Sequence, residues 1–175
     1  MQNLRQYYNN VIKYNLITKY NFNNIFKIPK IEKIILNIGF KNSAINKKKI
    51  IPIILLLKLI INQTVLLTKS KKNKIVFKIK KGTITGCKIT LRNQNLYEFL
   101  EKFIIFILPN FKNPIKINKN NILTFQIKNI LNFFELEKEF LKFQKIPPID
   151  ITIHTNNTKD YKKFLGLLNH FSLIN

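Results

Sequence analysis

The stretch Gly86-Cys87-Lys88-Ile89-Thr90-Leu91-Arg92 alternates between apolar and polar residues. Successive side chains of a β-strand point to opposite faces, so the stretch predicts a strand whose two faces differ. Its apolar face suits a core and is formed by Cys87, Ile89 and Leu91. Its other face is polar and basic and is formed by Lys88, Thr90 and Arg92. Such a strand belongs to a sheet that is covered on one side only.

Four other segments predict strands of the same sheet. Two of them alternate clearly, with apolar positions at Leu123, Phe125 and Ile127 and at Ile149, Ile151 and Ile153. Lys33–Gly39 is more apolar, but Asn37 shares a face with Lys33 and Ile35. Val65–Lys69 predicts a short strand that leads into Ser70–Lys74.

Helical periodicity is clearest in three segments. The first runs from Leu96 to Leu108, where Asn95 can cap the start and Pro109 marks the end. The second lies near the C-terminus, where Thr158 can cap the start. Its apolar stripe comprises Tyr161, Phe164, Leu165, Leu168 and Phe171.

The third is the opening segment, and a fourth segment predicts a helix less directly. Gln2–Tyr20 carries one apolar side, formed by Leu4, Tyr8, Val11 and Ile12. Lys48–Ile61 is apolar almost all round, which indicates either a buried helix or a strand.

These elements predict an α+β fold, a two-layer sandwich in which helices cover one face of a mainly antiparallel sheet. The other face would be basic, polar and open to RNA, although polar side chains of an antiparallel sheet can also simply face water. We expect one domain over residues 1–175. Its parts would be an N-terminal helix (1–20), a core (30–108), a loop-rich region (109–148) with a Lys/Asn-rich loop at Asn110–Asn121, and a final strand and helix (149–171).

The charge of the chain indicates a polyanionic partner. The 175 residues include 31 Lys and Arg against 8 Asp and Glu, a formal net charge of +23. With 46% hydrophobic residues the chain can still fold around a core. A folded domain this basic repels itself unless it binds a polyanion. AT-rich codon usage is the alternative explanation for many lysines, but it does not explain the few carboxylates.

The densest basic segment is Lys69–Lys81, in which Ile75, Phe77 and Ile79 are interleaved with lysines. Lysines can neutralise RNA phosphates, and Phe77 can pack on a base or sugar. A solvated hairpin is the alternative, but the charge of the whole chain favours contact with nucleic acid.

The sequence argues against an enzyme and predicts neither cofactor nor metal. His154 and His170 have no metal-ligand spacing and no nearby carboxylate partner. Cys87 lies on the apolar face of its strand and is expected in the core. The only acidic cluster, Glu135, Glu137 and Glu139, fits a helix surface.

Targeting features are sparse. Met1–Asn10 has no apolar signal core, and the apolar run Ile50–Ile61 is broken by Pro52 and Lys58. We therefore expect no membrane insertion. The AT-driven composition favours synthesis inside an organelle, with the mitochondrial matrix as the expected location and a plastid or AT-rich bacterium as alternatives.

Several motifs together resemble the bacterial-type family of the large ribosomal subunit protein L-five. Leu66-Leu67-Thr68-Lys69 through Gly86–Arg92 is similar to the centre of that family without gaps. Similar motifs are Lys30–Gly39 upstream and, downstream, Tyr97-Glu98-Phe99-Leu100-Glu101-Lys102 and Ile149-Asp150-Ile151-Thr152-Ile153. The resemblance covers nearly the whole chain.

The resemblance implies a structural protein of the central protuberance that binds 5S rRNA and large-subunit rRNA. The family's RNA-facing polar residues fall on Asn37, Gln63 and Thr90, while Lys33, Lys88 and Arg92 would neutralise phosphate. The hairpin Asn73–Lys81 resembles the loop that approaches peptidyl-site tRNA, here with Lys74, Phe77, Lys78, Lys80 and Lys81. Small-subunit protein thirteen and neighbouring large-subunit proteins are further implied partners.

The chain departs from the family at the hairpin tip, where Ile75-Val76-Phe77 replaces Ala-Gly-Phe, so the bend cannot rely on glycine. Two other functions stay open. One is a scaffold for large-subunit rRNA alone, in a ribosome without 5S rRNA. The other is a basic protein-interaction or membrane-surface module.

Overall fold

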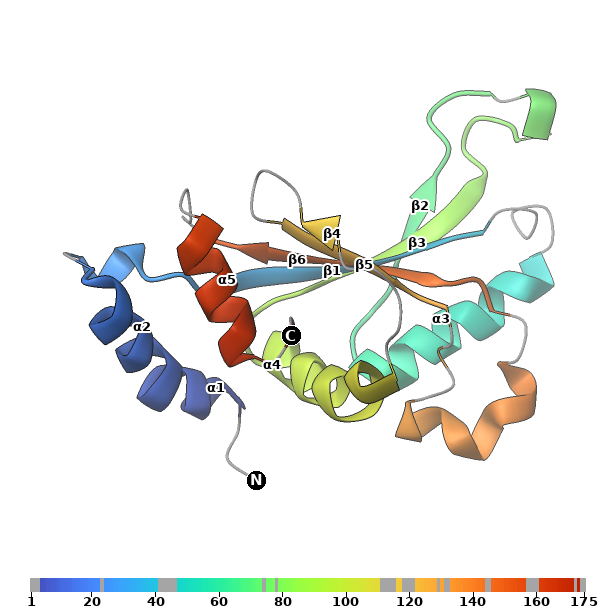
Figure 1. The fold of residues 1–175 in the computed structure, drawn as a ribbon. Helices are drawn as coiled ribbons and strands as arrows, with labels where there is room; N and C mark the ends of the chain where they lie inside the picture. Colours follow the sequence, from blue (N-terminus) through green and yellow to red (C-terminus); the bar gives the residue numbers. More distant parts are fainter. Residues whose placement is uncertain are drawn as a thin grey trace. The chain divides into compact units, whose positions relative to one another are not determined.

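The structure, a computed structural model, describes residues 4–22, 24–40, 47–73, 75–77, 79–110, 116–117, 122–128, 130, 133–143, 146–156, 161–171 and 173. Among these residues the strands are β1 (Ile31–Gly39), β2 (Leu66–Lys69), β3 (Ile84–Leu91), β4 (Lys116–Ile117), β5 (Ile122–Ile127) and β6 (Ile149–Thr155). They pair in one sheet in the order β2-β3-β1-β6-β5-β4. The α-helices are α1 (Leu4–Tyr7), α2 (Lys13–Tyr20), α3 (Lys47–Ile61), α4 (Asn93–Lys102) and α5 (Tyr161–His170). The predicted α+β class is confirmed (Figure 1).

Burial along the strands confirms the predicted faces. On β3, Cys87, Ile89 and Leu91 are buried, whereas Lys88 and Thr90 are only half-buried. The same alternation holds on β5 and β6. On β1, the buried residues Ile34, Leu36 and Ile38 alternate with Ile35 and Asn37. Burying each of these branched side chains stabilises the fold by about 1.5–3 kcal/mol relative to exposure.

The chain forms two compact units. Unit 1 comprises Met1–Ile34, Leu91–Phe125 and Thr152–Asn175, and unit 2 comprises Ile35–Thr90 and Gln126–Ile151. Strands β1, β3, β5 and β6 each contribute residues to both units. A single domain over residues 1–175, with the four parts given above, stays a prediction.

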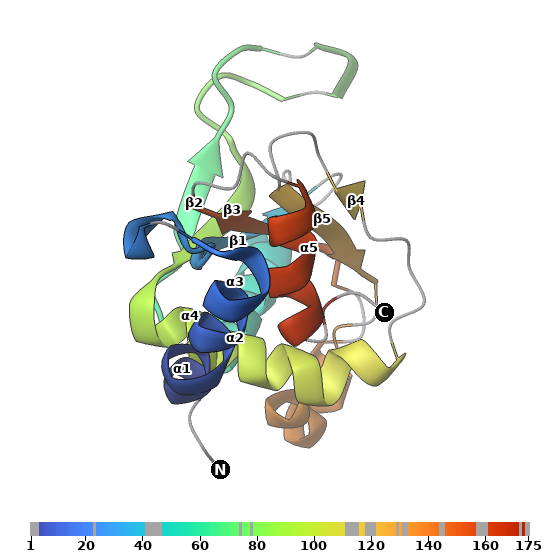
Figure 2. The ribbon, with the colours of Figure 1, turned by 60° about the vertical axis from the view of Figure 1, so that its left-hand side comes forward.

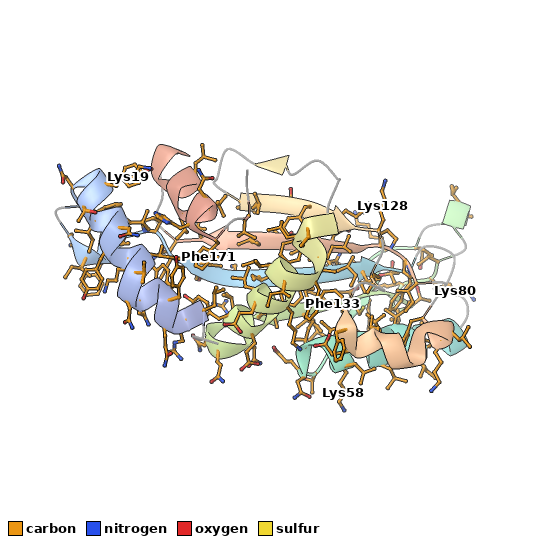
Figure 3. The ribbon with its side chains drawn as sticks, turned by 60° about the horizontal axis from the view of Figure 1, so that its bottom comes forward. Lys19, Lys58, Lys80, Lys128, Phe133 and Phe171 are labelled. Carbon is orange, nitrogen blue, oxygen red and sulfur yellow. The ribbon has the colours of Figure 1, made fainter. Side chains whose placement is uncertain are left out.

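Unit 1 is built around an aromatic cluster. The Tyr8 ring lies 6.1 Å from the ring of Phe171, which follows α5 (Figure 3), and 6.4 Å from that of Tyr97. The Tyr8 hydroxyl donates a hydrogen bond of 3.0 Å to the carbonyl of Pro29, so both buried groups have a partner. Burial raises the pKa of Tyr8 and of Tyr97, because the phenolate would lose its hydration.

In unit 2, α3 packs against the 3₁₀ helix η8 (Phe134–Lys142). Helix α3 confirms a helix over Lys48–Ile61, and the alternative of a strand is wrong. Only one of its faces is buried, however. Ile53, Leu56, Leu57 and Ile60 are buried, whereas Ile51, Leu55 and Leu59 are about half exposed.

Helix boundaries differ from the prediction in unit 1. The opening segment is helical from Leu4 to Tyr20, with a π-helical turn, η1 (Tyr8–Ile12), between α1 and α2. Helix α4 begins at Asn93, so Asn95 is not its cap; Arg92 occupies the cap position without a side-chain bond. Asn93 has a φ of 51°, and Asn tolerates this left-handed conformation, which lets β3 turn directly into the helix.

The end of this helical segment is also irregular. A π-helical turn, η5 (Phe103–Ile107), and a 3₁₀ turn, η6 (Leu108–Asn110), follow α4. Pro109 therefore lies inside η6 rather than beyond the last turn. In so short a turn the missing proline N–H removes no regular helix bond.

The loop predicted at Asn110–Asn121 contains a short strand. In it β4 pairs antiparallel with β5, Lys116 opposite Thr124 and Ile117 opposite Leu123. The other residues of that loop after Asn110 lie outside the described residues, as does the predicted cap Thr158. Leu168 and Phe171 of the predicted C-terminal stripe are buried.

Candidate nucleic-acid interface

Gln63 and Thr90, predicted from different segments, are neighbours in unit 2. Helix α3 ends at Ile61, and Asn62 follows with a φ of 57° and donates its N–H to Lys58 O at 2.9 Å. This left-handed cap turns the chain toward β2. The Gln63 Nε2 then donates a hydrogen bond of 3.4 Å to the Thr90 carbonyl on β3. The bond holds the segment between α3 and β2 beside the C-terminal end of β3.

A cavity of about 360 Å³ lies at this bond. Its lining residues are Gln63, Thr64, Val65, Leu66, Lys88, Ile89 and Thr90. None of these carries a negative charge, and three of them are predicted RNA-binding residues. The cavity therefore combines one cation with amide and hydroxyl groups, which suits an RNA backbone and its base edges.

Asn37 lies on β1, which is the neighbour of β3 in the sheet. The Phe40 N–H donates to the Thr85 carbonyl at 2.8 Å and so aligns the two strands. Counting back along an antiparallel pair from this bond brings Asn37 opposite Lys88. The Asn37 side chain is exposed, so its amide is available to a ligand.

Lys33 and Arg92 belong to unit 1. Lys33 is half-buried on β1. The guanidinium of Arg92 lies 3.6 Å from the carboxylate of Glu32, and both side chains are about half exposed (55% and 47%). An exposed pair of this kind contributes little to stability. The Glu32 carboxylate does offset part of the charge of Arg92. The alternation of apolar and polar residues in the sequence did not reveal this partner.

A second acidic group lies on the polar face of the strands in unit 2. The Gln126 Nε2 on β5 donates a hydrogen bond of 2.7 Å to the Asp150 carboxylate on β6. Alternation had placed both residues on that face but had given neither a role. A carboxylate there repels phosphate, so it limits the area that RNA can contact.

The connection between β2 and β3, residues 70–83, projects as a hairpin arm (Figures 1 and 2). Its base is closed by two backbone bonds of 2.9 Å, from Ser70 N to Thr83 O and from Gly82 N to Ser70 O. Gly82 has a φ of 87°, which glycine adopts without steric cost. The side-chain oxygen of Asn73 accepts a bond of 2.6 Å from Lys81 N and bridges the two sides.

The tip of the arm is the 3₁₀ turn η4 (Ile75–Phe77). Ile75 and Val76 are 90% and 89% exposed. The turn at Gly82 and the Asn73 bond thus shape the arm without a glycine at its tip. Lys80 and Lys81 are exposed, while Lys74, Lys78 and the side chain of Phe77 lie outside the described residues.

The remaining candidates for chemistry are structural. Cys87 is fully buried, and burial raises the pKa of its thiol to about 12, so it is no nucleophile at neutral pH. Within the described part of the chain, no three His, Cys, Asp or Glu side chains gather where they could hold a metal ion. No helix in that part is long and apolar enough to cross a membrane.

Comparison with known proteins gives consistent matches. Residues 84–173 match the model of the C-terminus of the ribosomal L5 family. The chain is 40% identical over 173 residues to the large ribosomal subunit protein uL5m of Reclinomonas americana, covering 96% of this chain and 94% of that protein. It is 34% identical over 173 residues to the large ribosomal subunit protein uL5 of Helicobacter acinonychis (strain Sheeba), covering 96% of each. It is 36% identical over 161 residues to uL5 of Wolbachia sp. subsp. Drosophila simulans (strain wRi), covering 89% of this chain and 90% of that protein.

A basic α+β chain with such relatives is a structural ribosomal protein and not an enzyme. Within that class, the chain belongs to the ribosomal L5 family. The resemblance stated from the sequence motifs is thereby confirmed.

Proposed function

We propose that this protein is a structural constituent of the large ribosomal subunit that binds rRNA through the polar face of its sheet. The hydrogen bond between Gln63 and Thr90 carries the proposal, because it brings residues from two segments to one cavity that holds a cation and no carboxylate. Asn37 and Lys88 lie on the neighbouring strands of unit 2. We call Asn37, Gln63, Lys88 and Thr90 the sheet-face cluster.

The members of this cluster have different roles in the proposed contact. Gln63 uses its amide N–H to hold Thr90, so its side-chain oxygen is left to accept from RNA. The Thr90 hydroxyl and the Asn37 amide supply further directional bonds. Lys88 neutralises phosphate, and Lys33 and Arg92 in unit 1 do the same there, Arg92 with its charge partly offset by Glu32.

The proposed RNA ligands are 5S rRNA and large-subunit rRNA in the central protuberance. The support is the positions of Asn37, Gln63 and Thr90, which coincide with the family's RNA-facing polar residues. A scaffold that binds large-subunit rRNA alone is the second candidate. One measurement distinguishes the two candidate functions: the affinity of the chain for 5S rRNA on its own.

We further propose that the hairpin arm contacts peptidyl-site tRNA. Lys80 and Lys81 are exposed near its base, and the arm's base is closed by backbone bonds that hold its direction. Lys74, Phe77 and Lys78 are assigned to the same contact from the sequence. Small-subunit protein thirteen and neighbouring large-subunit proteins are the proposed protein partners.

The proposed location is a mitochondrial ribosome, in the matrix. The support is the 40% identity to uL5m of Reclinomonas americana together with the AT-driven composition. A bacterial ribosome is the alternative location, because bacterial relatives are 34–36% identical to this chain.

Sedimentation tests the proposal. Ribosomes from the source cells are separated on a sucrose gradient in moderate salt and then in high salt, and the protein is followed by immunoblot. Co-migration with large subunits in moderate salt, and release as salt rises, is the expected result. Migration with membranes or with a protein complex free of rRNA would instead support a basic interaction module.

A further inference from the structure

A second cavity, of about 390 Å³ and open to the surface, lies where α2 and α5 of unit 1 meet. Its lining residues are Lys19, Tyr20, Leu165, Gly166, Asn169 and His170. None of them belongs to the sheet-face cluster or to the hairpin arm. Figure 3 labels Lys19, which comes from the C-terminal end of α2. We call this the α2–α5 cavity.

Gly166 lets the Tyr20 ring approach α5 closely beside the α2–α5 cavity. A Cβ at this position would lie 2.5 Å from the Tyr20 hydroxyl and 2.9 Å from Tyr20 Cε2. The ring therefore rests directly on the backbone of α5. Glycine inside a helix is less favourable than alanine, and this is one of only four glycines in the chain. The close approach of the Tyr20 ring accounts for the glycine at this position, since a larger residue would displace the ring.

The lining has the chemistry of a nucleotide site. The Lys19 ammonium lies 5.7 Å from the centroid of the Tyr20 ring, within the range of a cation–π contact, which orients it at the cavity. Asn169 and His170 add polar groups on α5, Leu165 adds an apolar surface, and no carboxylate is found among the described residues that line the cavity. The volume lies within the range of small-molecule sites.

We propose that the α2–α5 cavity binds one nucleotide of ribosomal RNA, as a contact separate from the sheet-face cluster. The phosphate lies against Lys19 and His170, and the ribose or base lies against Tyr20 and Leu165. The Asn169 amide hydrogen-bonds to a base edge. Single-stranded RNA suits such a cavity because its bases are free to turn out of a stack. The inference rests on the proposed function in that the ligand is the RNA of the ribosome.

The first test measures binding of the full-length chain to transcribed large-subunit rRNA by filter retention at a series of KCl concentrations. Lys19→Gln should weaken binding about fivefold to tenfold and lower the salt slope by about one, as for a lost phosphate contact. Lys27→Gln is the matched control, since Lys27 is exposed and lies outside the cavity. It should change affinity by less than about twofold. Circular dichroism establishes that both variants are folded.

A second test uses ultraviolet crosslinking of intact large subunits followed by mass spectrometry of the tryptic peptides. RNA adducts on the peptide that begins at Tyr20, or on the one that spans Leu165 to His170, are expected. If Lys19→Gln behaves like Lys27→Gln and these peptides carry no RNA, the inference is wrong. In that case, weaker rRNA binding by an Asn37→Ala variant would show that the proposed function still holds although this inference fails. If the wild-type chain binds no rRNA, both this inference and the proposed function are wrong.

Discussion

The side-chain amide of Gln63, between α3 and β2, donates a 3.4 Å hydrogen bond to the carbonyl of Thr90 on β3. Only the backbone of Thr90 takes part, so its hydroxyl is not consumed by this bond. Substitutions at these two residues can therefore separate two effects: one on the position of the segment before β2, and one on the polar groups that are proposed to face RNA.

This separation predicts different outcomes at the two residues. Thr90→Val keeps the side-chain shape and the bond from Gln63 but removes the hydroxyl. We expect rRNA affinity to fall by about 1 kcal/mol while the urea midpoint hardly changes. Gln63→Leu removes the bond itself and should lower both the rRNA affinity and the urea midpoint. Equal effects of the two substitutions on stability would contradict this division.

Asn37→Ala tests the exposed amide on β1. The loss of a polar contact to RNA should weaken binding by about 1–2 kcal/mol, a fivefold to thirtyfold change in affinity. Asn9→Ala is the matched control, because Asn9 is equally a surface amide and lies on η1. Filter binding with 5S rRNA and with large-subunit rRNA, measured separately, also tells which RNA this amide contacts. If the two variants bind rRNA with equal affinity, Asn37 is not part of the site.

The hairpin arm should affect tRNA more than assembly. In the double variant Lys80→Glu, Lys81→Glu, two exposed cations become anions that repel tRNA phosphate. We expect reduced occupancy of the peptidyl site by tRNA, measured by filter binding to purified ribosomes, with a normal yield of large subunits. Lys58→Glu on α3 is the control for charge reversal at an exposed lysine. Loss of subunits with normal tRNA occupancy would contradict the assignment of the arm.

Tyr8→Phe tests the core of unit 1. The substitution deletes the hydroxyl that donates to the Pro29 carbonyl and leaves a buried carbonyl without this donor. The free energy of unfolding should fall by about 1–3 kcal/mol. Tyr14→Phe, at a side chain that is 62% exposed, should have almost no effect. Urea denaturation of both variants, with unchanged slopes, is the measurement.

Cys87 makes the stability depend on pH. Burial raises the pKa of its thiol to about 12, so the folded chain holds this proton more tightly than the unfolded chain. Its contribution is fully present below the unfolded pKa of about 8.5 and is lost as the pH rises from there toward 12. Cys87→Ser should lack this contribution in urea titrations between pH 8 and 10. In the native wild type, alkylation at pH 8 should proceed only at the rate of unfolding.

The sequence predicted the faces of the strands well because their alternation is a local property. The buried set Cys87, Ile89 and Leu91 followed from a period of two, and so did the exposed amide of Asn37. Helix starts were less predictable. Asn93 rather than Asn95 begins α4, because a left-handed Asn permits a direct turn out of β3.

The contacts between distant segments could not be predicted in this way. Glu32 and Arg92 form an ion pair that depends on how β1 and the end of β3 meet. No local feature of the sequence predicts this pair. The approach of Tyr20 to Gly166 is of the same kind, although a glycine inside a predicted helix of a glycine-poor chain was a usable signal. Alternation placed Asn37, Lys88 and Thr90 on polar strand faces, and the family resemblance added Gln63. Their proximity followed only from the fold.

Sequencing of the RNA that is crosslinked to the purified protein tests the central proposal most directly. We predict strong enrichment of ribosomal RNA, in 5S rRNA or in one region of large-subunit rRNA, and a reduced enrichment when Asn37 and Thr90 are both substituted. Recovery of unselected cellular RNA, or enrichment that is indifferent to these two substitutions, would contradict rRNA binding by the polar face of the sheet.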